Sequence, residues 1–565
     1  MTTPSKKEKG QALPLVTLGL IAMCGMMGLA VDLGWSYFVK RSAQSATDAA
    51  AQAAVEQALN TVGQAGMFTC SGGQVTCEPA PVPCNASGNL STGCQYAQRH
   101  DFTVGGHNQH QNVMIAADVT SPAPTAPGVT VDYWVTVRAT ESIPQLFSAV
   151  LGNTVGSSAA RSTAAVLGVQ LPAQVYALDR QNDAAPGSKK GSTGNDISIQ
   201  GGGGIVAYGG ISLASTDPHA GQLGGSGSVT APATYIRGTG GYGNSGNWTA
   251  TPTTGMPDGN LFTDPLESGT PPLGQPPAPT GLADHPILNG VVPANQVLPS
   301  GNYYSVNSKG VPDGQPLSFG ANTTFKNGPF GNFVIFGGIQ GNVTFGPGRY
   351  IFAGSTTGTT LNWNSVKVQD QTPPDASGNA TAPNDAGELF VLTDTHYPGL
   401  QIPSALANTP SVLNNLAQGN VVIQSGNSSN WGIDLHGLNP SSTDVPPELK
   451  PFSPTLLWQD EANTTIKYNP DGSIDTSCGS LDSPCLNTNL KSTDSTYWTI
   501  DANPNVQLWG ALYQPRGAGI FFQGHGTLTA PMQIVTGYIS MQGGPSIVLS
   551  KVPNGLRHRV TALIE

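Results

Sequence analysis

A long uncharged stretch near the N-terminus constrains the fold most. Gly10–Val31 are 22 residues without an Asp, Glu, Lys, Arg or His. As a helix rising 1.5 Å per residue this run is about 33 Å long, enough to cross a hydrocarbon core of roughly 30 Å. The run leads directly into another helical pattern, with no cleavage site followed by a polar segment. We therefore expect an uncleaved transmembrane helix; a secretory signal peptide is the alternative.

The charges beside this run predict its orientation. Lys6, Lys7 and Lys9 precede it, whereas Asp32 follows it. The positive-inside rule then places the N-terminus in the cytoplasm and the bulk of the chain outside. The whole chain has a net charge of −11 and no stripe of Lys and Arg, so we expect no nucleic-acid partner.

The helical pattern continues beyond the uncharged run. Trp35, Tyr37 and Phe38 fit an aromatic belt at the outer membrane interface. Small side chains then recur at helical spacing and predict a helix-packing face, formed by Ala43, Ala46, Ala50, Ala53 and Ala54. An Ala-rich spacer, stabilised by helix propensity alone, is the alternative.

Gly10–Ala54 resembles the N-terminal segment of TadG-like proteins of the Flp/Tad (tight adherence) pilus assembly system. The matching pieces are Gly10-Gln-Ala, Gly28-Leu-Ala-Val-Asp32 and Asp48-Ala-Ala-Ala. A second stretch is similar to the strand, turn and closing strand of that family, at Tyr133–Arg138, Ile143–Phe147 and Ser157–Ala165.

The resemblance implies a protein of the bacterial inner membrane, single-pass, with its bulk periplasmic or at the cell surface. Its implied partners are pilins or pseudopilins, or the pilus secretion machinery. One position departs from type IV pilins, which carry Glu at the fifth residue after their processing site. If Gly10 preceded such a cut, that residue here would be Leu15.

The cysteines indicate an oxidising compartment. Cys24 lies within the uncharged run, and six others follow it: Cys70, Cys77, Cys84, Cys94, Cys478 and Cys485. Their spacing lacks the closely spaced cysteine pairs, about two to four residues apart, that are typical of structural zinc sites. We therefore expect disulfides rather than a metal. Cys478 and Cys485 should pair with each other, and the first four allow three connectivities.

Beyond residue 170 short apolar runs alternate with Gly, Asn and Pro turns, and only 10% of the chain is charged. This pattern of short apolar runs and turn residues predicts a strand about every 7–12 residues. The strands would form a β-solenoid (β-helix) or, alternatively, a β-sandwich. Leu456–Thr465, Trp509–Pro515 and Gln533–Gly537 also resemble the C-terminal β-solenoid of many TadG-like proteins.

The chain lacks the clustered residues that catalysis needs. Gly524-His525-Gly526 is similar to a motif of β-helical pectin-degrading enzymes, but no paired Asp residues accompany it. His100, His107 and His110 lie in a polar loop and give only a weak metal signal. We therefore expect no enzyme, no cofactor and no metal.

These observations predict a mainly β protein with an N-terminal transmembrane helix. We expect a cytoplasmic stub, transmembrane helix and Ala-rich helical extension over 1–60, and a small disulfide-bearing, β-rich, pseudopilin-like domain over 61–170. A Gly/Asn/Thr-rich, β-solenoid-like extracytoplasmic region should follow over 171–565. The expected function is pilus assembly or a minor pilus-associated role in adherence and surface presentation. The alternative is an anchored β-helical protein that binds or degrades polysaccharide, with a surface glycan as its partner.

Overall fold

The computed structural model describes residues 12–564, and the gaps within that range are 65–67, 71–73, 86, 120–128, 172, 179–195, 217–218, 240–241, 243–245, 258–261, 263, 265, 267–273, 326–328, 365–367, 371–385, 396, 414, 425–431, 440, 461–496, 516–518 and 553–554. The fold is mainly β with an N-terminal apolar helix, as predicted. Contacts divide the chain into unit 1 (Met1–Val169 with Arg559–Glu565) and unit 2 (Gln170–His558). The division differs from the sequence-based one, which left the last seven residues with the β-rich region.

Unit 1 is organised along one continuous helix, α1 (Ala12–Val62). Among the described residues it is the one helix long and apolar enough to cross a membrane. Its large apolar side chains are exposed from Leu15 to Phe38, whereas from Val39 onward its small apolar side chains are buried. The two halves of α1 therefore meet different surroundings, and only the second half belongs to the core of unit 1.

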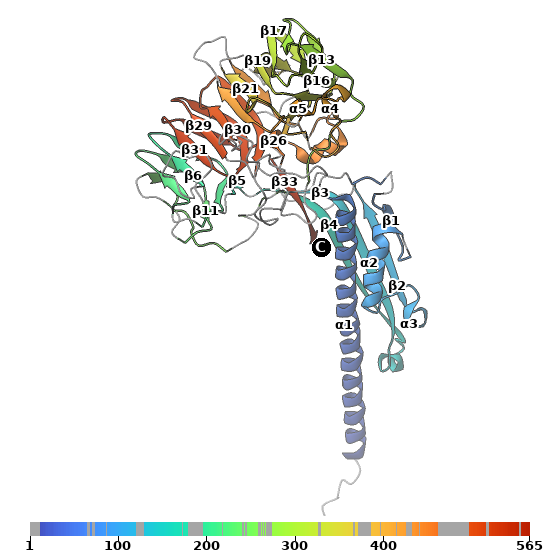
Figure 1. The fold of residues 1–565 in the computed structure, drawn as a ribbon. Coiled ribbons are helices and arrows are strands. Elements are labelled where there is room, and N and C mark those ends of the chain that lie inside the picture. The colour runs from blue at the N-terminus through green and yellow to red at the C-terminus, as the bar shows by residue number, and fades with distance from the viewer. Residues whose placement is uncertain are drawn as a thin grey trace, which may run out of the picture. The chain divides into compact units, whose positions relative to one another are not determined.

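An antiparallel sheet lies along the second half of α1 (Figure 1). Its strand order is β1-β2-β3-β4-β33, with bounds Glu78–Pro83, Gln111–Asp118, Val129–Pro144, Val155–Gln170 and Arg557–Leu563. β3 and β4 form a long hairpin closed by a 3-10 turn, η1 (Ser148–Leu151). The other helical segments of unit 1 are α2 (Gly88–Arg99) and a short turn, α3 (Gly106–Gln109).

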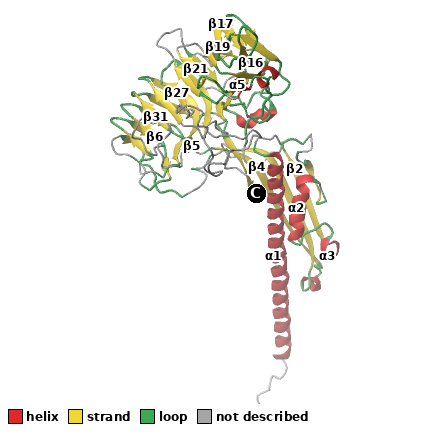
Figure 2. Cartoon of the chain, in the orientation of Figure 1, coloured by secondary structure: helices red, strands yellow, loops and turns green. Residues whose placement is uncertain are grey.

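Unit 2 consists mostly of short strands (Figure 2). Its named strand pairs are parallel within the described residues, and most strands pair with the one two or three places later in the chain. The first series of neighbours is β13 (Asp284–Leu288), β16 (Gly301–Val306), β18 (Gly331–Phe336), β20 (Gly348–Ala353), β23 (Glu388–Thr393), β26 (Thr455–Gln459), β28 (Val506–Gln514), β30 (Thr527–Thr536), β5 (Ala173–Ala177), β8 (Gly210–Leu213) and β11 (Thr234–Ile236).

A second series runs beside the first. It comprises β14 (Val291–Val292), β15 (Val297–Leu298), β17 (Leu317–Phe325), β19 (Ile339–Phe345), β21 (Thr359–Asn364), β22 (Val368–Asp370), β24 (Asn420–Gln424), β25 (Ile433–His436), β27 (Tyr497–Asp501), β29 (Gly519–Gln523), β31 (Ile539–Gln542), β6 (Ile197–Ile199) and β9 (Gly221–Leu223). A shorter third series contains β32 (Ser546–Ser550), β7 (Gly204–Ala207), β10 (Ser228–Thr230) and β12 (Asn247–Trp248), and β32 pairs with the start of β30. The helical segments of unit 2 are α4 (Ser404–Ala407), α5 (Pro410–Leu413) and η2 (Pro447–Phe452).

The order of strands in unit 2 brings its two ends together. The last strands, β30, β31 and β32, pair with the first, β5, β6 and β7. The first strands also pair on their other side with β8, β9 and β10. The first strands of unit 2 therefore lie inside the stack, between its last strands on one side and β8, β9 and β10 on the other.

The core of unit 2 contains aromatic side chains in register. Phe333, Tyr350 and Phe390 occupy paired positions on three neighbouring strands, and the rings of the first two stack 4.7 Å apart. Between β18 and β19 the chain turns at Gly337 and Gly338, whose φ angles are 100° and 85°. A Cβ at Gly337 would meet the carbonyl of Gln315 at 2.7 Å, so this turn requires glycine.

Candidate functional site

The helix–hairpin junction is where two segments of the family resemblance meet. The Asp32 carboxylate accepts hydrogen bonds from three consecutive backbone N–H groups, those of Leu146, Phe147 and Ser148, at 3.2, 3.1 and 2.8 Å. It also accepts one from the Ser148 hydroxyl at 2.8 Å. Asp32 is 6% exposed, so these donors replace the water that a carboxylate otherwise needs. The carboxylate thereby fixes the hairpin tip (Gln145–Thr154) against α1.

Gly28, one helical turn before Asp32, allows the same contact. A Cβ at Gly28 would lie 2.3 Å from Cγ of Phe147, far closer than carbon atoms approach without a bond. Residues four apart share a helix face, so Gly28 and Asp32 receive the hairpin tip together. Both segments belong to the family resemblance, but nothing in the sequence indicates that they touch, since 114 residues separate Asp32 from Leu146.

The predicted helix-packing face lies in the core of unit 1. Ala43, Ala46, Ala50 and Ala54 are fully buried and Ala53 is 8% exposed. The elements that contact α1 most extensively are α2 and β3. A Cβ on Gly93 of α2 would lie 2.7 Å from the carbonyl oxygen of Ala50 and 3.0 Å from Cβ of Ala54. The small side chains therefore let α2 approach α1, and this face is not left open for a separate pilin.

A buried polar bridge joins the same elements. The Asn89 side-chain amide donates to the Tyr133 hydroxyl at 2.8 Å and to the Ala54 carbonyl at 3.4 Å. The Tyr133 hydroxyl in turn donates to the carbonyl of Thr76 at 2.6 Å. Burial raises the pKa of Tyr133, so its hydroxyl keeps its proton and remains a donor.

Two disulfides strengthen unit 1. Cys70 bonds to Cys77, and Cys84 bonds to Cys94, which ties the end of β1 to α2. Of the three open connectivities, the structure has the one that pairs sequence neighbours. Cys478 and Cys485 lie outside the described residues.

The end of α1 is clamped by the C-terminal strand. Nε of Arg559 donates to Oδ2 of Asp132 at 2.6 Å. Its Nη1 donates to the carbonyls of Gly63 and Gln64 at 3.0 and 2.7 Å, and its guanidinium lies 4.9 Å from the ring centre of Phe68. Gln64 also exchanges two hydrogen bonds with the backbone of Arg559. Unit 1 is thus completed by residues that follow unit 2 in the sequence.

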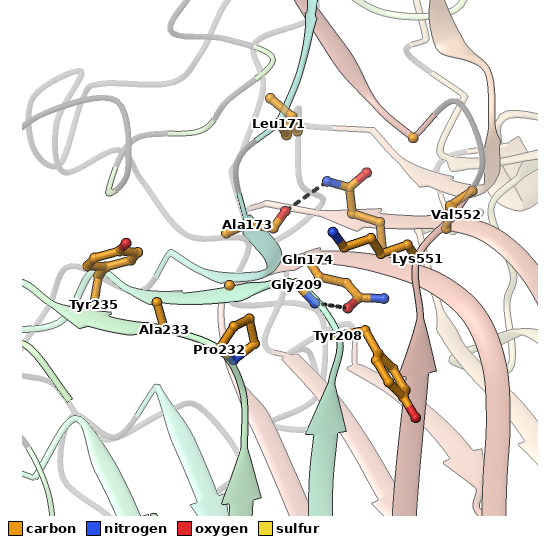
Figure 3. Close-up of a pocket in the computed structure, with 13 residues that line it drawn as sticks. Leu171, Ala173, Gln174, Tyr208, Gly209, Pro232, Ala233, Tyr235, Lys551 and Val552 are labelled. Carbon is orange, nitrogen blue, oxygen red and sulfur yellow. Dashed lines mark hydrogen bonds between the residues drawn. The ribbon is translucent and has the colours of Figure 1, made fainter. Parts of the chain in front are cut away.

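A cleft of about 550 Å³ lies in unit 2 near its first and last strands (Figure 3). The Gln174 amide donates to the carbonyls of residues 532 and 550 and accepts from the N–H of Gly209. Gln533 donates to the carbonyl of Ala173 and accepts from the N–H of Leu556. Both glutamines therefore hold backbone together, and the side chains that the cleft presents to solvent include Tyr208 and Lys551.

The structure does not bring the ligand atoms of the three candidate histidines, His100, His107 and His110, within 4.8 Å of one another. Nδ1 of His107 lies 2.9 Å from Oε1 of Glu141. Among the described residues, the group close enough to hold a metal is Cys70, Cys77 and Asp118, whose two sulfurs are already bonded to each other. His525 is exposed in the turn between β29 and β30.

The carboxyl group of Asp434 in unit 2 has a raised pKa. Burial raises the pKa of Asp434, on β25, to about 6, although the charge of His436 opposes the shift. Its buried Oδ1 has no hydrogen-bond partner among the described residues. Ionising this group therefore costs stability, because burial takes water away from the charged form and Oδ1 gains no donor in exchange.

Comparison with known proteins agrees with the N-terminal resemblance. Residues 10–58 match a protein-family model described as "Putative Flp pilus-assembly TadE/G-like". The matched segment contains most of α1, including Gly28, Asp32 and the five alanines. No curated protein and no solved structure matches the chain.

Proposed function

We propose that this chain is a membrane-anchored component of a Flp/Tad pilus system, either an assembly protein or a minor pilus-associated protein. The observation that carries the proposal is the family match over residues 10–58, which falls on a helix with an exposed apolar first half. The second half of α1 belongs to the hydrophobic core of unit 1, so the family match covers both the membrane anchor and the part of α1 that joins it to unit 1.

The anchor crosses the bacterial inner membrane once, with the N-terminus in the cytoplasm. Lys6, Lys7 and Lys9 support this orientation through the positive-inside rule. The two disulfides of unit 1 also support an oxidising compartment outside the cytoplasm. Unit 1 and unit 2 are then periplasmic or presented at the cell surface.

Pilins, pseudopilins or the secretion machinery bind the apolar half of α1 within the membrane. The alanine face is occupied by α2 and β3, so it does not serve this contact. The exposed side chains between Leu15 and Val31 are the surface that remains.

Unit 2 is a β-solenoid that acts without catalysis as a rigid presenting element in adherence. Three observations support the solenoid architecture. The named pairs of unit 2 are parallel, each strand pairs with neighbours on both sides along most of the first series, and paired positions stack like side chains. A sandwich of Greek-key type would instead pair its strands antiparallel.

The test changes only the anchor, because deleting α1 would also remove the core of unit 1. In a strain that lacks the gene, we would express the chain with Leu20→Arg and Met23→Arg, both at exposed positions of α1. Each arginine costs roughly 2.5–3.5 kcal/mol at the centre of a membrane helix. A Leu20→Met, Met23→Leu variant is the matched control.

We expect the arginine variant to leave the membrane fraction and to restore neither Flp pili nor surface adherence. The control should restore both. Normal piliation and adherence in the strain that lacks the gene would contradict the proposal.

A further inference from the structure

We propose that the hairpin tip enters the lipid interface beside α1, so that unit 1 contacts the membrane at a second place. The inference rests on the membrane anchoring proposed above. It follows from the depth, the composition and the hydrogen bonding of the tip.

The depth of the tip is set by its contact with α1. The Phe147 ring lies against Gly28, three residues before Val31, the last residue of the uncharged run. At 1.5 Å per residue the ring therefore lies about 4.5 Å inside the end of that run. It lies about 10 Å deeper than Trp35, which is 56% exposed and belongs to the aromatic belt. A helix inserted through this run carries the tip with it to the level of the interface.

The composition of the hairpin tip and of the strand ends beside it suits that level. Ser142–Ala160 contains no Asp, Glu, Lys, Arg or His. Leu146 is 73% exposed, Phe147 46% and Val155 56%, although each is apolar. Exposed apolar side chains that continue the apolar surface of a membrane helix fit lipid better than water, and burial to about 5–10 Å is typical of interfacial segments.

The hydrogen bonds of the tip remove the main obstacle to this placement. Irregular backbone is costly in lipid because its N–H groups lose water. At the tip, Asp32 accepts from the three consecutive N–H groups that enter η1. These three hydrogen bonds and the one from the Ser148 hydroxyl satisfy the Asp32 carboxylate, so neither partner needs bulk water at this level.

The experiment measures the depth of single labelled cysteines. Full-length protein is reconstituted in vesicles of phosphatidylcholine and phosphatidylglycerol that carry a nitroxide either near the headgroup or near the acyl-chain end. An environment-sensitive fluorophore is attached to native Cys24, to Leu146→Cys or to Ala80→Cys, the last two in a Cys24→Ala background. Protein with Cys24→Ala alone gives the background of labelling.

Ala80 is the matched control because it is exposed and lies at the other end of the sheet of unit 1. It belongs to β1, whose partners on β2 pair with the Val135 region of β3. Nine residues of strand separate Val135 from Pro144, which is about 30 Å at 3.3 Å per residue. Leu146 and Ala80 are both exposed, so neither substitution removes a packed side chain.

We expect the shallow nitroxide to quench the Leu146 label at least about threefold more than the Ala80 label, as for a segment at interfacial depth. The deep nitroxide should quench the Cys24 label. Equal quenching at Leu146 and Ala80, with Cys24 quenched, overturns the inference and leaves the anchor intact. A Leu146 label shielded from aqueous iodide but quenched by neither nitroxide means that protein covers the tip, which also overturns it. An unquenched Cys24 label overturns the anchor and the inference together.

Discussion

Replacing Arg559 by Ala should release the C-terminal strand from unit 1. The substitution removes the contact of Nε with Asp132 at 2.6 Å and the two contacts of Nη1 with the carbonyls at the end of α1. It also removes the cation–π contact with Phe68. The backbone hydrogen bond from Arg559 to Gln64 remains, so the variant tests the side chain alone.

The magnitude follows from these contacts. A hydrogen bond between charged partners contributes about 1.5–3 kcal/mol, a bond to a neutral carbonyl about 0.5–1.5 kcal/mol. The ring contact adds about 0.5–1 kcal/mol. Because the side chains of Arg559 and Asp132 are 14% and 25% exposed, water recovers part of the loss. We expect a net loss of about 2–4 kcal/mol, which is a factor of roughly 30–900 in the equilibrium for opening β33.

Hydrogen exchange of the full-length protein in nanodiscs measures this opening. Amides of β33 should exchange faster by the factor given, while those in the centre of unit 2 keep their rates. Arg138→Ala is the control, since Arg138 is exposed on β3 of the same sheet and faces Arg161 across the strands. The reasoning is refuted if Arg559→Ala changes β33 exchange no more than Arg138→Ala does.

Three further changes probe other parts of the account. Gly93→Ala should lower the free energy of unfolding of unit 1 by about 1–3 kcal/mol, and with it the Tm, because the added Cβ would press on Ala50 and Ala54. An unchanged Tm would show that α2 can shift without cost. Asp32→Asn should speed exchange of the hairpin-tip amides at least about tenfold, since the amide loses the charge and one acceptor; unchanged exchange would disprove its role. The raised pKa of Asp434 favours folding below about pH 4, and this contribution to stability is lost as the pH rises through about 6. Asp434→Asn should therefore stabilise unit 2 at pH 7 by about 1–2 kcal/mol, a figure reduced for the partial exposure of the side chain, and should have no such effect at pH 4. Equal shifts in Tm at both pH values would contradict this.

Local patterns in the sequence predicted elements, but not the contacts between distant ones. The uncharged run and the alanine spacing predicted α1, because helical periodicity is a local property. The strands around Tyr133–Arg138 and Ser157–Ala165 were likewise found within β3 and β4. In contrast, α2 was missed, because its 12 residues include two glycines and no apolar stripe of large side chains.

The partners of Asp32 and Arg559 could not be predicted from local patterns. In the sequence, Asp32 is the charge that follows the uncharged run. The groups that donate hydrogen bonds to its carboxylate lie 114–116 residues away. Arg559 belongs to a strand whose neighbours precede it by about 400 residues, and no local signal identifies such a pairing. The docking of β30–β32 on β5–β7 is a long-range pairing of the same kind.

Cross-linking from the apolar half of α1 tests the central claim most directly. A photoreactive phenylalanine derivative would replace Met26, which is 66% exposed, in the native bacterium, with the same group at Ala80 as the control. Our account predicts adducts between Met26 and Flp pilins or Tad assembly proteins that the Ala80 position does not form. Adducts from Met26 that contain only lipid, or only proteins outside the pilus system, would contradict it.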